Sequence, residues 1–225
     1  MDLIQNILLA ILPPLYLVYY IYKNDLYEKE SHRHLIISLV LGSLVTIPVI
    51  FIELATTVVF SNNVFLFAMI GIALVEEGSK LLILKYFCFP KKEFNEPYDG
   101  IMYAVVISMG FALVENLFYV LGNSENGMTI GILRLFTAIP LHATCGVIMG
   151  YYMGIAKMDS KKALQSILLA IALPVLIHGL YDYFLLEEFE GFGVVYSLMI
   201  VIAAIVYSNK AVRLHQSNSP FKFKN

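Results

Sequence analysis

Seven long apolar runs constrain this chain more than any other feature of its sequence. They lie at residues 3–22, 35–59, 64–89, 101–121, 129–156, 163–186 and 192–207. Their lengths are close to or above the ~20 residues that a helix needs to cross a bilayer. Because backbone polar groups inside lipid must pair within the protein, such segments cross as helices. The sequence therefore predicts an all-α, polytopic transmembrane helix bundle of about seven spans.

The composition supports one integral-membrane domain over residues 1–225. Hydrophobic residues make up 59% of the chain and charged residues only 14%, against about 25% charged in soluble domains. No basic patch indicates nucleic acid, so the lipid bilayer is the first expected partner. The polar stretch 208–225 is expected to be a flexible cytoplasmic tail.

Basic residues are distributed unequally between the connections. The first, third and fifth connections and the tail hold Lys or Arg, whereas the second, fourth and sixth hold none. Cytoplasmic loops carry the excess of Lys and Arg in membrane proteins. The pattern predicts an N-terminus outside and a C-terminus in the cytoplasm.

Three charges lie in the middle of the run 64–89, in the sequence Glu76-Glu77-Gly78-Ser79-Lys80. On a helix, Lys80 is one turn from both carboxylates. Ionisable groups at this depth are costly, face a bundle interior or a water-filled cavity, and mark functional sites by default. The alternative is a structural ion cluster that locks helix packing.

Three further polar clusters interrupt later apolar runs. Glu115 and Asn116 lie in the run 101–121, and His142 lies on a stripe with glycines at every fourth position. Such a stripe permits close helix contact, which turns His142 into the bundle. His178 and Asp182 are one turn apart, so the carboxylate can orient the imidazole.

Helix lengths place the four clusters at similar depths, from the bilayer midplane into the outer leaflet. Their carboxylates outnumber Lys80 and Arg134, and like charges in a low dielectric cannot all stay ionised. Either a glutamate holds a proton and can act as a base, or the site binds a cation. Zinc is one candidate, and its predicted ligand set is Glu76, Glu115, His142 and His178.

The ordered set of motifs resembles the PrsW family of intramembrane proteases, in the superfamily of CAAX-type prenyl endopeptidases and Abi proteins. The matching residues are E-E-x-x-K at 76–80, F-x-x-x-E at 111–115, His142 and H-x-x-x-D at 178–182. The prenyl-endopeptidase branch has E-E-x-x-x-R and F-x-x-x-H instead. The resemblance therefore argues against processing of prenylated CAAX proteins.

The resemblance implies intramembrane proteolysis in a bacterial cell membrane. The substrate would be a single-span protein such as an anti-sigma factor, cut on the extracytoplasmic side. Glu76 would activate the attacking water with help from Glu77, while Glu115 and His178 would hold this water or stabilise the oxyanion. The supporting residues would be Lys80, Asn116, His142 and Asp182.

Two other classes of function also fit buried Glu, His and Lys residues. One is an ion- or proton-coupled transporter, although the paired broken helices typical of such folds are not evident in the sequence. The other is a non-catalytic membrane immunity or scaffold module. The sequence also leaves open whether a metal takes part and which of Glu76 and Glu77 is the base.

Overall fold

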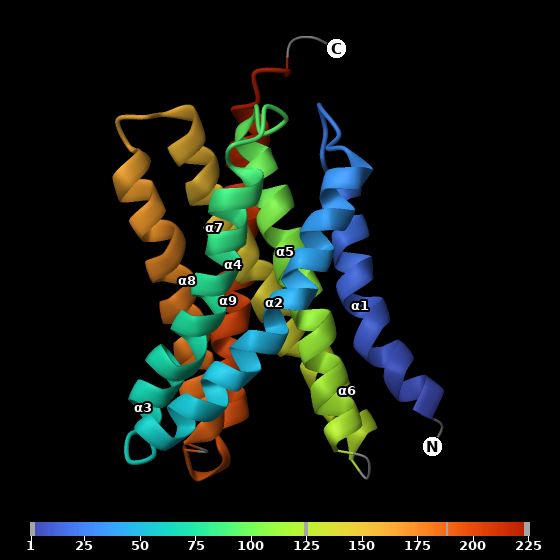
Figure 1. Cartoon of the computed structure of the whole chain (residues 1–225), viewed down its shortest axis with the longest axis vertical. Coiled ribbons are helices and arrows are strands. Elements are labelled where there is room, and N and C mark those ends of the chain that lie inside the picture. The colour runs from blue at the N-terminus through green and yellow to red at the C-terminus, as the bar shows by residue number, and fades with distance from the viewer. Residues whose placement is uncertain (1–2, 124–125, 188, 223–225) are drawn as a thin grey trace.

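Helices form almost the whole chain (Figure 1). The computed structural model describes residues 3–123, 126–187 and 189–222, and these contain no β-strand, which confirms the all-α prediction. The α-helices are α1 (Leu3–Lys23), α2 (His32–Val59), α3 (Val64–Leu66), α4 (Leu74–Ile83), α5 (Pro97–Gly122), α6 (Gly127–Phe136), α7 (Ala138–Met158), α8 (Ala163–Leu186) and α9 (Gly193–Ser217). Two π-helical segments flank α4, and a 3-10 turn precedes α9: η1 (Phe67–Ala73), η2 (Leu84–Cys88) and η3 (Phe189–Gly191).

Six helical stretches in the described part of the chain are long and apolar enough to cross a membrane. Four are α1, α2, α8 and α9, one is α5, and one combines α6 with α7. A further helical path, Val64–Cys88, runs without interruption through α3, η1, α4 and η2. The two chain ends lie at opposite ends of the bundle (Figure 1), as an odd number of passes requires. The count of seven spans and the N-out orientation stay predictions.

Helix α5 is the centre of the bundle. All of its residues from 97 to 112 are buried. It meets α7 so closely that a Cβ on Gly150 would lie 2.2 Å from the Gly100 carbonyl oxygen. This contact uses the predicted glycine stripe of α7, and His142 on the same stripe is only 1% exposed. The prediction that His142 faces the interior is therefore confirmed.

The apolar run 129–156 is broken into two helices, which the sequence did not reveal. The break is at Thr137, whose φ of −121° and ψ of −78° are not helical. Pro140 lies in the first turn of α7, where its missing N–H leaves no intrahelical bond unmade. Arg134 on α6 and His142 on α7 lie on either side of this break.

The expected tail begins as helix. Helix α9 continues to Ser217, and its residues Ala211 and His215 are buried. Beyond the helix, the Ser219 hydroxyl donates a hydrogen bond to Glu96 in the connection before α5. Residues 223–225 of the expected tail lie outside the described residues.

Candidate active site

Helix α4 brings three charges together in the bundle interior. The Lys80 ammonium lies 3.0 Å from Glu76 Oε2 and 2.8 Å from Glu77 Oε1. The Lys80 side chain is fully buried, and its ammonium also lies 4.2 Å from the centre of the Phe111 ring. A charge buried this deeply needs several partners. The one-turn spacing on α4 supplies the two carboxylates, and α5 supplies the Phe111 ring.

His178 on α8 joins Glu77 to Asp182. Its Nδ1 lies 2.9 Å from Glu77 Oε1, and its Nε2 lies 3.3 Å from Asp182 Oδ2. Both neighbours are carboxyl groups, which accept hydrogen bonds when ionised. Two hydrogen-bonded arrangements satisfy both ring nitrogens. Either the imidazole is protonated and donates to both carboxylates, or the ring is neutral and accepts a hydrogen bond from one protonated carboxyl group.

His142 on α7 has a different set of partners. The Lys80 ammonium lies 3.1 Å from its Nδ1, and Glu115 Oε2 lies 2.8 Å from its Nε2. Because an ammonium can only donate, Nδ1 accepts, and Nε2 carries the proton and donates to Glu115. The two histidine rings meet edge to face, with their centres 5.1 Å apart.

Glu115 on α5 also forms an ion pair with Arg134 on α6. Arg134 Nη2 lies 2.7 Å from Glu115 Oε2, and Arg134 Nε donates to Asn116 Oδ1 at 2.5 Å. The guanidinium lies 4.1 Å from the centre of the Tyr119 ring. Helix α6 thus supplies a second permanent cation beside Lys80.

A cavity of about 390 Å³ borders this polar cluster. Glu76, Glu115, His142, His178 and Asp182 line it, whereas Glu77 and Lys80 lie behind its wall. Its lining also includes Leu186, the last residue of α8, and Asn123, the residue directly after α5. Those helix ends lie at the end of the bundle that holds the N-terminus (Figure 1). The cavity therefore leads from the polar cluster toward the end opposite the basic connections.

Glu53 on α2 lines the same cavity and was not predicted. Its carboxyl group interacts with that of Glu76, and its Oε1 is buried with no hydrogen-bond partner in the described part of the chain. The available signal was a single carboxylate within the apolar run 35–59. Five carboxyl groups then share the site with two permanent cations, so protons or a bound cation must supply the missing positive charge.

All eight predicted site residues lie in this cluster or in contact with it. The four side chains that could hold a metal ion differ in one member from the predicted ligand set, because Glu77, not Glu115, groups with Glu76, His142 and His178. One ligand atom from each of these four lies within 4.8 Å of the others. Glu115 instead holds the far nitrogen of His142, as Asp182 does for His178.

The set of donor groups fits zinc. Two imidazoles and two carboxylates are common zinc ligands, and carboxylates on the outer ring nitrogens orient such ligands. The Lys80 ammonium contacts Glu76, Glu77 and His142 within this set. A bound ion would therefore require Lys80 to turn away from these ligands.

Comparison with known proteins identifies the family of this chain. The model of the family described as PrsW family intramembrane metalloprotease matches residues 30–208. The chain belongs to the PrsW family. The Protease PrsW of Oceanobacillus iheyensis is 34% identical over 92% of this chain and 95% of its own. The Protease PrsW of Bacillus subtilis is 34% identical over 78% of this chain and 80% of its own.

Membership of the PrsW family identifies an intramembrane protease and a multi-pass bacterial membrane protein. The Clostridioides difficile Protease PrsW is 32% identical over 87% of this chain and 85% of its own. No solved structure matches the chain. The polar cluster and its cavity are therefore the candidate active site of a PrsW-family protease.

Proposed function

We propose that Glu76 is the general base of a peptide-bond hydrolysis carried out in the cavity. The observation that carries this assignment is that Glu76 borders the cavity, while Glu77 and Lys80 lie behind its wall. A base must reach the proton that it removes. Glu77 instead contacts Lys80 and His178, which supports a positioning role.

In the proposed reaction, water attacks the scissile carbonyl carbon and gives one proton to Glu76. The carbonyl oxygen becomes an oxyanion on a tetrahedral intermediate. Glu76 then passes the proton to the leaving amine as the C–N bond breaks. The products are a carboxylic acid and an amine, so one water is consumed and no other reactant is needed.

The oxyanion needs positive charge or hydrogen-bond donors nearby. Arg134 and His178 both line the cavity and can supply them. Glu115 can only accept hydrogen bonds when ionised, so we assign it a role in holding His142 and Arg134 in place, not in stabilising the oxyanion. Asp182 holds His178 from its other ring nitrogen.

A zinc ion, if bound, would be held by ligands drawn from Glu76, Glu77, His142 and His178, with one position left for water as in catalytic zinc sites. When bound there, it would supply a Lewis acid and lower the pKa of a bound water. Glu115 and Asp182 would then orient the two imidazoles. Arg134 and Glu53 line the cavity with or without the ion, whereas the role of Glu76 as general base applies to the reaction without it.

The proposed substrate is a single-span membrane protein, such as an anti-sigma factor, cut near the outer membrane surface. The course of the cavity toward the N-terminal end of the bundle supports this. A helix hides its backbone carbonyls in hydrogen bonds, so the scissile segment must be extended. A juxtamembrane segment is extended more easily than the middle of a transmembrane helix.

The test is cleavage of a reconstituted single-span substrate by wild-type protein, Glu76→Gln and Glu77→Gln in liposomes. Gln keeps the shape of Glu but cannot take the proton, so Glu76→Gln is expected to remove cleavage while Glu77→Gln retains a slow rate. The reverse order would contradict the assignment. A parallel wild-type reaction with a chelator, followed by added zinc, determines whether the ion is required.

A further inference from the structure

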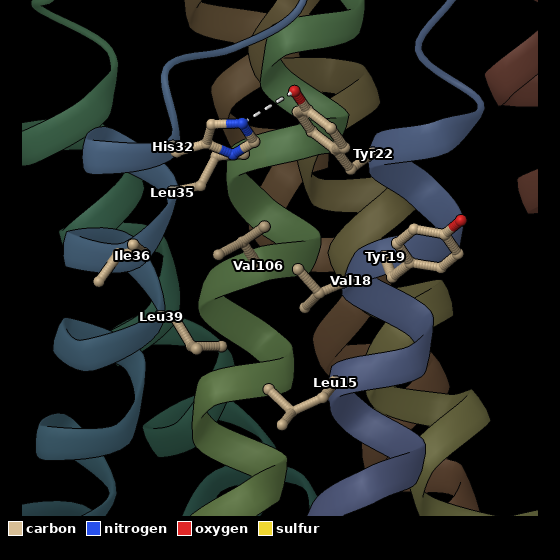
Figure 2. A pocket seen from close by; sticks show the side chains of 9 residues that line it. All are labelled: Leu15, Val18, Tyr19, Tyr22, His32, Leu35, Ile36, Leu39 and Val106. Atoms are coloured by element: carbon tan, nitrogen blue, oxygen red, sulfur yellow. Dashed lines mark hydrogen bonds between the residues drawn. The ribbon is translucent and has the colours of Figure 1, made fainter.

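Helix α1 lies against the bundle with a groove on each side. The groove between α1 and α2 is shown in Figure 2 and has a volume of about 370 Å³. Leu15, Val18 and Leu39 point into it, and Tyr22 and His32 meet at one end with 3.5 Å between Tyr22 Oη and His32 Nε2. The second groove, between α1 and α9, is larger, at about 530 Å³.

The deep part of the α1–α9 groove is apolar. Helices α5 and α7 form its floor, and side chains of α1 and α9 form its walls; its apolar lining includes Leu17, Ile21, Val105, Ala143, Val147 and Ile205. Along α9 it extends from Ile205 to Gln216, which is ~16 Å at 1.5 Å per residue. This length matches one leaflet of a hydrocarbon core ~30 Å thick.

Polar groups are concentrated at one end of this groove. Asn24, Asn209, Arg213 and Gln216 line it there, and Gln216 Nε2 donates to the Asn24 carbonyl oxygen at 2.6 Å. Arg213 is exposed and forms no ion pair with the residues that the structure describes. Lys210 lies three residues before Arg213 on the same helix, and both residues line the surface next to the groove. This end thus has unneutralised positive charge beside an apolar groove of leaflet depth.

We propose that the α1–α9 groove binds one anionic phospholipid. An acyl chain lies along the apolar walls, and the phosphate lies at Arg213, where Lys210 adds charge and Asn209 adds a hydrogen-bond donor. A guanidinium binds phosphate oxygens through two parallel N–H groups. The groove in Figure 2 has no Lys or Arg among its nine lining residues, so it offers no comparable headgroup selection.

The experiment is native mass spectrometry of the full chain released from micelles that contain phosphatidylglycerol and phosphatidylcholine in equal amounts. Wild-type protein is expected to retain one phosphatidylglycerol in preference to phosphatidylcholine. Arg213→Gln should weaken this preference about fivefold, since one basic residue at a membrane surface contributes about that factor. Arg33→Gln is the matched control, because Arg33 is also exposed and basic but lines neither groove.

A second variant tests the acyl-chain part of the groove. Ile205→Trp fills the groove from a partly exposed position and should reduce retention of the lipid while the melting temperature stays within a few degrees of wild type. Equal retention of the two lipids by wild-type protein would overturn the proposal. So would retention unchanged by Arg213→Gln, or a lipid-free dimer in place of the lipid-bound monomer.

Discussion

Two groups of buried carboxylates lie in different parts of this bundle and are held in different ways. The first is the polar cluster of the candidate active site, where Glu76, Glu77 and Glu115 contact Lys80, Arg134 or histidines beside a cavity. The second is an acidic end cluster near the connections before α2 and α5; its members are Asp25, Glu30, Glu96 and Asp99.

The acidic end cluster has hydroxyl and backbone N–H groups as its donors. Tyr103 donates to Glu30, Ser219 donates to Glu96, and two backbone N–H groups donate to Asp99 Oδ2 at 2.7 Å. Burial raises the pKa of Asp25 to about 7, with the nearby Glu96 adding to the effect. Burial likewise raises the pKa of Glu30 and of Glu96.

The difference teaches that a buried carboxylate alone does not mark a site in this protein. Both clusters are buried, but only the first combines carboxylates with imidazoles, permanent cations and a cavity. Neutral, protonated carboxyl groups can hold the second cluster together through hydrogen bonds alone. We expect substitutions in the polar cluster to change mainly the activity, and substitutions in the acidic end cluster to change mainly the stability.

The largest expected contrast is between two buried histidines. His178→Ala removes the ring between Glu77 and Asp182 and should lower the cleavage rate by at least about 100-fold, the scale of general acid–base and oxyanion effects. His215→Ala is the matched control, since His215 is also buried but lies outside the polar cluster, where it hydrogen-bonds the Tyr151 carbonyl oxygen and stacks on the Tyr151 ring. Rates in liposomes measure both, and equal losses would remove the distinction between the regions.

A smaller effect is expected for Asp182→Asn. Asp182 contacts His178 at its outer ring nitrogen, and loss of such a supporting contact typically costs about 10–100-fold. The cleavage rate should therefore fall less than in His178→Ala. A folded Asp182→Asn protein with no measurable activity would give Asp182 a direct part in the chemistry.

The smallest effect on activity is expected for Asp25→Asn, which should change stability instead. The folded pKa of about 7 lies above the ordinary value of 3.8, so the folded state holds this proton more tightly than the unfolded state. Stability is therefore lost as pH rises from about 4 to about 7.

Asn removes this pH-dependent loss. The melting temperature of Asp25→Asn in detergent should exceed that of wild type at pH 8 by about 2–4 °C, the shift that ~1 kcal/mol gives in a chain of this size. The advantage should shrink toward pH 4. A variant that melts below wild type at pH 8 would show that the ionised Asp25 carboxylate stabilises the fold.

The sequence predicted the apolar helices and the four polar motifs because both leave local patterns. Glu76, Lys80, His178 and Asp182 show their contacts through one-turn spacing. Glu53 has no such partner within its own run, because the carboxyl group that it meets is on α4. Its role in the cavity could be read only from the packing of α2 against the rest of the bundle.

The acidic end cluster was missed for a related reason. Glu30 and Glu96 lie in polar connections, where charged side chains are normally exposed, and three separate segments bury them together. The predicted metal ligands included Glu115, whereas Glu77 lies with Glu76, His142 and His178 in the group that could hold an ion, and the reason is similar. Helical spacing gave Glu115 no partner, whereas in space Arg134 and His142 occupy its carboxylate.

The most direct test of this account is the position of the cut in a single-span substrate. The cavity leads from Glu76 toward the end of the bundle opposite the basic connections, which the positive-inside rule assigns to the outside. Mass spectrometry of both cleavage fragments should place the scissile bond in the outer leaflet or the extracytoplasmic juxtamembrane segment. A cut on the cytoplasmic side of the substrate would contradict both the orientation and the assignment of this cavity as the place of cleavage.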